Sequence, residues 1–388
     1  MKLWHLAFAL TASFATAENK IEHLTPPILE RATVASEVTC TRPMREGTFN
    51  ISTETVGNQF VVHCYGHGGC GWTTFMGSVE RAIELLQRKY PTPMMTPPIR
   101  VIGTGCMGLC STIELIRRGY TVTGITTDEL YNIPSWNAAG YYAIVSVKIS
   151  PEEEAAVNQI NLFTFRAYQK IQAGTHPYLT TKAVRYLPVY CSEDTHAGVE
   201  ELEEYKMIPP REIVDIDFGN GVVHKNFKKM MTYFFDVTTL MQDLHAEVAR
   251  LQVPIEKRKI VHFDELAEEI VFNCTGLGGG DLAKDVKMIP VRGHLVMLNE
   301  GAGKGHMDYM IYTKVQQEGK EEYVYFFPRT HFINPTGQGS PAYGVLGGTF
   351  LANADKMPAP ELSQLDELEF KRLLDRNSMF FHGKPFSD

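Results

Sequence analysis

A glycine-rich stretch at residues 103–108 (GTGCMG) has the spacing that binds the phosphates of a dinucleotide. Gly103 permits a tight turn, Gly105 lets the backbone approach a pyrophosphate, and Gly108 lets the following helix pack closely on the preceding strand. The start of that helix offers free N–H groups and partial positive charge to the phosphates. These residues therefore predict a dinucleotide site, with a purely structural glycine turn as the alternative.

A second glycine-rich stretch, residues 65–73 (YGHGGCGWT), comes earlier in the chain and also precedes a helical pattern. Its four glycines would let the backbone lie against a flat ring. The helix start behind them would direct N–H groups at negative charge on that ring. Gly71, Trp72 and Thr73 are the expected donors, and His67 is expected to pack and hydrogen-bond rather than to act as a base.

The two stretches together resemble motifs of the FAD-dependent D-amino-acid oxidase family. Other segments resemble the same family at residues 135–140 (SWNAAG), 259–263 (KIVHF), 272–278 (FNCTGLG), 290–295 (PVRGHL), 325–328 (YFFP) and 346–350 (LGGTF). Residues 36–90 resemble the family's C-terminal part and residues 99–380 resemble the rest, weakly through 150–235. Because the family carries these two parts in the opposite order, the resemblance implies a circularly permuted chain.

The resemblance implies oxidative deamination of a D-amino acid, with hydride transfer from Cα to flavin N5. Residues 41–45 (TRPMR) resemble a segment whose first Arg binds the substrate carboxylate, which assigns Arg42. A guanidinium suits this role because it makes two parallel hydrogen bonds to a carboxylate. Tyr325 is the phenol expected beside that carboxylate, with Tyr323 as a second candidate. The Gly69 carbonyl would accept a hydrogen bond from the substrate amine.

The expected cofactor is FAD. Its expected contacts come from the two glycine-rich stretches, the small-residue loop at 135–140, and the three segments that resemble the family at 259–263, 272–278 and 290–295. These residues are Gly103, Gly105, Cys106, Met107, Gly108, Thr126, Ala138, Ala139, Gly140, Ile260, Gly276, Arg292, Gly68, Gly69, Gly71, Trp72 and Thr73.

Two residues depart from the expected pattern. A dinucleotide site normally has an acidic residue at the end of its second strand to hold the ribose, but Ile125 stands there. Asp128 would reach in from the following loop, or the backbone with Thr126 or Thr127 would hold the ribose instead. His294 replaces the usual Gln of the segment at 290–295.

The apolar periodicity predicts the elements that position these residues. Helices are expected at 72–89, 106–118, 151–173, 238–251 and 362–376, and strands at 46–62, 100–103, 121–125, 260–263 and 269–273. Residues 180–235 and 290–350 read as strand-rich, with a hairpin at Gly219-Asn220-Gly221. Residues 90–98 contain four prolines and form a joint that is neither helix nor central strand.

The expected fold class is α/β, with a Rossmann-like FAD-binding domain and a mixed or antiparallel β-sheet substrate domain, circularly permuted. Residues 18–98 form the permuted segment. The FAD-binding domain takes residues 99–150 and 236–300, and the substrate domain takes residues 151–235 and 301–388.

Composition limits the partners. The chain has 388 residues, 44% of them hydrophobic, and a net charge of −8 without a basic stripe, so nucleic acid is not expected.

The N-terminus predicts a Sec-type signal peptide cleaved after Ala17, and hence export. The prediction rests on Lys2, the apolar run at 3–14 and the small residues of Ala15-Thr16-Ala17. A buried N-terminal helix and an uncleaved anchor are the alternatives. No membrane span is expected after cleavage.

Seven cysteines without a disulfide framework are expected to be mostly small buried residues, with a functional disulfide as the alternative. No Cys/His spacing predicts a metal site.

The expected partners are an amino-acid substrate and oxygen, which would yield hydrogen peroxide, or another electron acceptor. Two other functions stay open: a related flavin amine oxidase or dehydrogenase of the glycine or sarcosine type, and a flavin-binding interaction protein without catalysis. A nicotinamide-dependent dehydrogenase is disfavoured, because it gives the second glycine-rich helix start no role.

Overall fold

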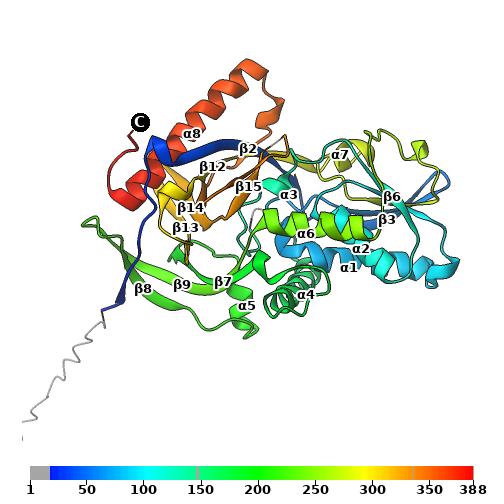
Figure 1. Cartoon of the computed structure of the whole chain (residues 1–388), viewed down its shortest axis with the longest axis horizontal. Coiled ribbons are helices and arrows are strands. Elements are labelled where there is room, and N and C mark those ends of the chain that lie inside the picture. The colour runs from blue at the N-terminus through cyan, green and yellow to red at the C-terminus, as the bar shows by residue number, and fades with distance from the viewer. Residues whose placement is uncertain (1–17, 146, 148, 335, 388) are drawn as a thin grey trace, which may run out of the picture.

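The computed structural model describes residues 18–145, 147, 149–334 and 336–387. Two β-sheets lie along the long axis of the molecule, a smaller one with α1, α2 and α6 and a larger one with α8 (Figure 1). The expected signal peptide, residues 1–17, lies outside the described residues. Among the helices in the described ranges, none combines the length and the hydropathy needed to cross a membrane.

The smaller sheet carries both glycine-rich stretches. Its strands are, in spatial order, β10 (Ile255–Lys257), β6 (Val122–Thr127), β5 (Ile99–Ile102), β11 (Ile270–Asn273), β4 (Gln59–Tyr65) and β3 (Asn50–Val56). All neighbours are parallel except β3, which is antiparallel to β4. Every residue of β4 and β11 is buried, as expected for parallel strands that are covered on both faces.

Helices cover one face of the smaller sheet. They are α1 (Gly71–Lys89) and α2 (Cys106–Arg117), while α6 (Val237–Arg250) packs on α2 and α4 (Glu154–Gln172) packs on α1. The apolar side chains of α1 recur at three- and four-residue spacing and are at most 1% exposed: Phe75, Val79, Ala82, Ile83 and Leu86. Residues around α7 (Gly278–Leu282) and the single turn Phe263–Glu265 pack on the other face.

The larger sheet has mixed strand directions. Its strands run in the order β1 (Lys20–His23), β8 (Glu212–Asp217), β9 (Val223–Phe235), β7 (Val184–Ser192), β13 (Met310–Gln317), β14 (Lys320–Pro328), β17 (Gly344–Gly347), β12 (Met288–Leu298) and β18 (Leu351–Ala352), while β2 (Val34–Arg45) pairs with β12. The strands β15 (His331–Ile333) and β16 (Gly339–Pro341) form a separate pair. The short helices are α3 (Pro134–Asn137) and α5 (Glu200–Glu204).

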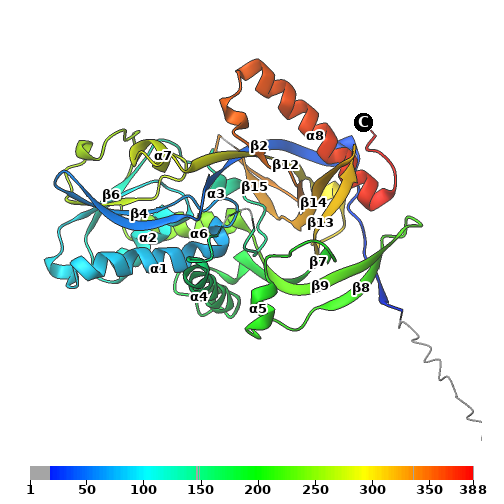
Figure 2. The ribbon, with the colours of Figure 1, turned by 180° about the vertical axis from the view of Figure 1, so that it is seen from behind.

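The helix α8 (Ala359–His382) lies across the larger sheet and buries Phe370, Leu373 and Phe381 against it (Figure 2). It ends at Gly383, whose φ of +67° is the left-handed conformation that commonly closes a helix. The last turn of α8 lies beside the segment that leads into β2, since His382 Nε2 is 2.9 Å from the carbonyl oxygen of Pro27.

The strand β2 is part of the larger sheet and leads the chain into the smaller one. It runs antiparallel to β12 from Met288 opposite Arg45 to Leu298 opposite Val34. The chain then continues from β2 into β3 and β4 of the smaller sheet. Residues 34–65 thus tie the two sheets together, and the turn after β4 lies where they meet.

Most predicted elements are confirmed, including the helices at α1, α2, α4 and α6 and the hairpin between β8 and β9. The predicted strand at 260–263 is wrong: the strand is β10, three residues long at 255–257, and the chain then leaves the sheet. The predicted terminal helix is too short, because α8 extends by three residues at its start and six at its end. The strand β12, within the range expected for the FAD-binding domain, is in the larger sheet.

Candidate active site

Both glycine-rich turns open into the same cavity, whose volume is about 670 Å³. This follows from the sheet order, because β5 and β4 lie on either side of β11 and all three are parallel. Their carboxyl ends therefore meet at one edge of the sheet, where α2 and α1 begin. Gly69 and Gly105 both line the cavity.

The turn between β5 and α2 is shaped by glycines with different roles. Gly103 has φ +102°, and a Cβ there would lie 2.5 Å from the carbonyl oxygen of Cys274. A Cβ on Gly108 would lie 1.9 Å from the carbonyl oxygen of Gly103, so this glycine permits the close packing of α2 on β5. Gly105 lines the cavity, whereas Gly108 is absent from the described lining residues.

The loop at 133–140 braces the starts of both helices. The backbone N–H of Cys106 donates to Ser135 Oγ at 3.0 Å, and the indole N–H of Trp72 donates to the carbonyl oxygen of Ser135 at 3.0 Å. The small side chains of Ala138 and Ala139 leave this loop open to the cavity. One loop thus fixes the distance between the two helix N-termini.

The turn between β4 and α1 is held against β2. The N–H of Gly68 donates to the carbonyl oxygen of Pro43 at 2.8 Å, and Met44 bridges to His67. His67 is buried and stacks on Phe49, with ring centroids 4.4 Å apart. Its Nε2 lies 3.1 Å from Ser78 Oγ, and burial lowers its pKa to about 3. His67 is therefore a neutral packing residue, as the sequence predicts.

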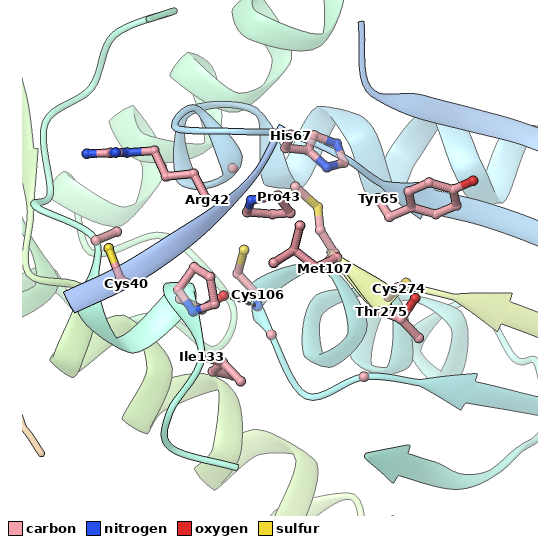
Figure 3. A pocket seen from close by; sticks show the side chains of 18 of the residues that line it. Cys40, Arg42, Pro43, Tyr65, His67, Cys106, Met107, Ile133, Cys274 and Thr275 are labelled. Carbon is pink, nitrogen blue, oxygen red and sulfur yellow. Dashed lines mark hydrogen bonds between the residues drawn. The ribbon is translucent and has the colours of Figure 1, made fainter. Parts of the chain in front are cut away.

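Arg42 extends from β2 into the part of the cavity away from Tyr65 and Cys274, as Figure 3 shows. Its Nη1 donates to the carbonyl oxygen of Thr349 at 3.0 Å, and its guanidinium carbon lies 4.4 Å from the centre of the Phe350 ring. A Cβ on Gly293 would lie 2.5 Å from Nη1, so the missing side chain makes room for the guanidinium. Arg42 is half-buried and retains polar hydrogens that can face a ligand.

Tyr325 lines the cavity beside Arg42 and is 4% exposed. Burial raises the pKa of its phenol to about 12, although the charge of Arg42 opposes this shift. Its ring stacks on Phe327 at 4.8 Å and covers Gly347, where a Cβ would lie 2.0 Å from the ring. The second candidate, Tyr323, is not among the described lining residues.

Thirteen of the expected cofactor residues line the cavity: Gly68, Gly69, Gly71, Trp72, Gly103, Gly105, Cys106, Met107, Ala138, Ala139, Gly140, Ile260 and Gly276. Thr73 does not, because it is buried behind the helix start and its hydroxyl donates to the carbonyl oxygen of Ala143 at 2.9 Å. Thr126 is buried in β6, with its hydroxyl 3.5 Å from Glu256, and its neighbours Thr127 and Asp128 line the cavity instead.

Arg292 was expected at the cofactor, but its side chain lies on the other face of the sheet. It forms ion pairs with Asp355 at 2.6 Å and with Asp366 at 2.7 Å. Successive residues of a strand point to opposite faces, and Leu295 lines the cavity whereas Arg292 and His294 face α8. The prediction is therefore wrong for Arg292, although Leu295 of the same segment lines the cavity.

Aromatic side chains form one wall of the cavity, and the sequence predicts only part of it. Tyr141, Tyr312 and Phe327 line the cavity with Tyr325 and Phe350. Tyr312 lies directly opposite Tyr325 in the β13–β14 ladder. The tight turn at Glu318-Gly319 could have fixed this register from the sequence, because a short hairpin loop determines which residues pair.

Four cysteines also line the cavity: Cys40, Cys64, Cys106 and Cys274. All seven cysteines of the chain lie in the described ranges and are free thiols, and only Cys40 is not buried. Burial raises the pKa of Cys106 to about 12, so this thiol is neutral at the start of α2. The expectation of small buried residues is confirmed.

The cavity fits FAD in its chemistry. The helix α2 begins behind backbone that carries no side chain at Gly105, which suits a pyrophosphate. Beside it, α1 begins behind Gly68 and Gly69, which leave backbone free to contact a flat ring. Arg258 and Lys259 add positive charge to the wall.

Solved structures to which this chain is similar include a double mutant of Amadoriase I from Aspergillus fumigatus, at 14% identity and a TM-score of 0.39, with 66% of this chain and 64% of that chain covered. The L-amino acid deaminase from Proteus myxofaciens has 12% identity and a TM-score of 0.39, with coverage of 83% and 64%. The L-amino acid deaminase from Proteus vulgaris has 12% identity and a TM-score of 0.39, with coverage of 66% and 61%. This chain spans less than two thirds of the length of each.

The family model described as "FAD dependent oxidoreductase" (DAO) matches residues 99–383. The match covers most of the chain and includes the glycine-rich turn after β5. The chain therefore belongs to the DAO family of FAD-dependent oxidoreductases, whose members bind FAD.

Proposed function

We propose that the protein carries out the oxidative deamination of D-amino acids with FAD. The observation that carries this proposal is the position of Arg42 and Tyr325, which line the same cavity as the glycine-rich turns before α1 and α2. A carboxylate-binding pair at the end of a cofactor cavity is what an amino-acid oxidase needs. The D preference rests on the resemblance of residues 41–45 and 65–73 to the D-amino-acid oxidases.

The chain's own residues would bind and orient the substrate. Arg42 would make paired hydrogen bonds to the carboxylate, and the Phe350 ring below it limits the directions that the guanidinium can take. Because the pKa of Tyr325 is raised to about 12, its hydroxyl keeps its proton and would donate it in a hydrogen bond to the same carboxylate. The Gly69 carbonyl would accept from the amine. Bound FAD would supply the hydride acceptor, and the protein would contribute by holding the substrate in a fixed orientation.

A side-chain base is not required if the amine enters neutral. His67 lines the cavity, but its Nε2 is directed at Ser78 and its pKa is about 3. The product imino acid would be hydrolysed by water to a keto acid and ammonia. Oxygen, giving hydrogen peroxide, or another acceptor would then take the electrons.

A panel assay tests this proposal. The purified FAD-loaded protein is incubated with D- and L-amino acids, glycine and N-methylglycine, and keto acid, ammonia and peroxide are measured. Turnover of D-amino acids supports the proposal. Turnover of glycine or N-methylglycine alone would favour the related amine oxidase. FAD binding without turnover of any compound would favour an interaction protein.

We also propose that the chain is a circular permutation of the family order. The family model matches from residue 99 onward, while Arg42 and the glycine-rich turn before α1 precede that point. In the family order the chain would run on from the end of α8 into the segment before β2, and the contact between His382 and Pro27 joins these two parts. Residues 90–98 join α1 to β5, where the family order would have its two termini.

We further propose export through the predicted signal peptide. The support is the sequence of residues 1–17, with its basic start, apolar run and small residues before Glu18. N-terminal sequencing of the protein recovered from outside the cytoplasm would begin at Glu18. A mature protein that begins at Met1 would contradict cleavage.

A further inference from the structure

A chain of hydrogen bonds lies behind Arg42, away from the cavity. The carbonyl oxygen of Thr349 accepts from Arg42 Nη1 at 3.0 Å. Thr349 Oγ1 accepts from the backbone N–H of His294 at 2.7 Å and lies 2.9 Å from His294 Nδ1. His294 Nε2 lies 2.8 Å from Asp366 Oδ1 on α8. Residues from β2, β12, α8 and the loop after β17 are thus connected in series.

The protonation states give every atom of this chain a partner. Burial alone would raise the pKa of Asp366, but hydrogen bonds from Arg292 and His294 outweigh it and hold the pKa low. Burial lowers the pKa of His294, so the imidazole is neutral. Since a carboxylate only accepts, Nε2 carries the proton and Nδ1 accepts from the Thr349 hydroxyl. That hydroxyl therefore donates one hydrogen bond and accepts another.

Thr349 has little freedom to move. It is 2% exposed and follows Gly348, whose φ is +134° and where a Cβ would lie 2.1 Å from the carbonyl oxygen of Tyr323. His294 is fully buried and its ring meets Phe370 of α8 edge-on at 4.9 Å. Thr349, His294 and Asp366 are all absent from the described lining of the cavity. Their influence on a bound ligand is therefore indirect, through Arg42 and the Phe350 ring that packs against it.

We propose that His294 and Asp366 are positioning residues: they fix Thr349, whose carbonyl holds the Arg42 guanidinium in the orientation that receives a substrate carboxylate. The inference rests on the proposed function, because it requires Arg42 to bind a carboxylate. It gives a role to the histidine that replaces the family's usual Gln. The ion pair between Arg292 and Asp366 holds α8 in place from the side, and the charged groups that act on the imidazole are Asp366, Glu369 and Arg292.

The test measures carboxylate binding rather than turnover. Benzoate, a carboxylate whose ring suits the aromatic wall, is titrated calorimetrically into FAD-loaded protein. Thr349→Val removes the hydroxyl at nearly constant volume, and we expect the dissociation constant for benzoate to rise about tenfold, the usual effect of one lost hydrogen bond. Thr349→Ser keeps the hydroxyl and should bind benzoate within about twofold of the wild type. FAD content and thermal midpoint are measured for each variant.

A second pair of variants avoids the buried core. Asp366 lies on the half-buried side of α8, and its neighbour Glu367 is exposed. Asp366→Ala should weaken benzoate binding at least about fivefold, whereas Glu367→Ala, which removes the same charge one residue away, should leave it unchanged.

The outcomes separate this inference from the proposed function. If the wild type binds benzoate and Arg42→Lys weakens binding, but Thr349→Val and Asp366→Ala bind as the wild type does, the positioning role is overturned and the function stands. Equal weakening by Thr349→Val and Thr349→Ser, or by Asp366→Ala and Glu367→Ala, would also overturn it. A wild type whose benzoate binding does not depend on Arg42 would overturn the proposed function and this inference with it.

Discussion

At the scale of single residues, the proposed substrate site around Arg42 offers groups of fixed orientation rather than a titrating base. Arg42 is held by Thr349 from behind and by Phe350 from below, and Tyr325 is a neutral phenol at its side. Residue types could assign Arg42 and Tyr325 from short motifs, because a guanidinium before a proline and a tyrosine in a strand are local signals. They could not reveal Thr349 or Asp366, which contact Arg42 or His294 only after folding.

Arg42→Lys should raise KM for a D-amino acid on the order of 10- to 100-fold, since a single ammonium cannot make two parallel hydrogen bonds to a carboxylate. Steady-state kinetics at saturating oxygen measure the effect, and FAD content should not change. Arg45→Lys is the matched control. Arg45 pairs with Asp285 at 2.7 Å and is absent from the described lining of the cavity. Equal changes in KM for the two variants would contradict the role of Arg42.

His67 predicts a specific acid sensitivity. Its pKa is about 3 in the folded protein because of burial, compared with an ordinary value near 6.5. The unfolded state therefore binds more protons between these values, so the free energy of unfolding must fall as the pH falls from about 6.5 towards 3. The loss attributable to His67 is about 2 kcal/mol between pH 6.5 and pH 5.

Denaturant unfolding at several pH values measures this loss. His67→Gln should have a shallower pH slope than the wild type, whatever its stability at pH 7. His306→Gln, at an exposed position, should keep the wild-type slope. If His67→Gln kept that slope as well, burial of a neutral imidazole would not be the cause.

At the scale of elements, periodicity predicts where the helices lie, but it does not predict which face of a strand points into the cavity. The helix α1 was predictable because Phe75, Val79 and Leu86 recur on one face and all three are buried. The direction of Arg292 was not, since alternation in a strand leaves open which set of residues faces the cavity. Likewise, the strand near 260 was misplaced because three residues of β10 are too few for a periodic signal.

The two glycines of the turn between β5 and α2 should respond differently to a side chain. In Gly105→Val the backbone can keep its φ of −70°, but the side chain would enter the cavity beside Ser135. We expect a folded protein that has lost FAD. In Gly108→Val the Cβ would meet the carbonyl oxygen of Gly103, and the apoprotein should lose about 1–3 kcal/mol of stability or more.

Apoprotein unfolding and FAD titration distinguish the two variants. Comparison in the apo state matters, because lost FAD binding lowers the apparent stability by itself. A Gly105→Val protein that binds FAD normally would show that the pyrophosphate does not approach this turn.

At the scale of the whole molecule, the meeting of two distant glycine-rich turns is the main long-range feature predicted from the motifs. The order β5–β11–β4 explains it, yet neither the pairing of β4 with β11 nor that of β2 with β12 is written in a local pattern. Such pairings depend on which surfaces remain to be covered once the helices form. The division into domains was hard to predict for the same reason, since β2 leads from one sheet into the other.

The permutation proposal predicts that the family order also folds. A chain with residues 99–387 first and residues 18–89 last, joined by a short flexible linker, should be soluble and bind FAD within a few-fold of the natural order. The reason is that His382 already contacts the backbone at Pro27, so the linker has only to span from the last turn of α8 to the start of β1. Circular dichroism and FAD titration of both chains provide the comparison. An insoluble or FAD-free rearranged chain, made beside a natural chain that binds FAD, would count against the proposal.

The most direct measurement is the visible absorbance of the bound FAD under anaerobic conditions, followed after mixing with matched D- and L-amino acids. This experiment requires neither oxygen nor any other acceptor, so it reports on hydride transfer from the substrate alone. The proposed oxidation of D-amino acids predicts that D-amino acids bleach the FAD absorbance, that their L-enantiomers do not, and that Arg42→Lys requires far more substrate for the same change. Bleaching by the L-enantiomers, or an unchanged spectrum with every pair, would contradict it.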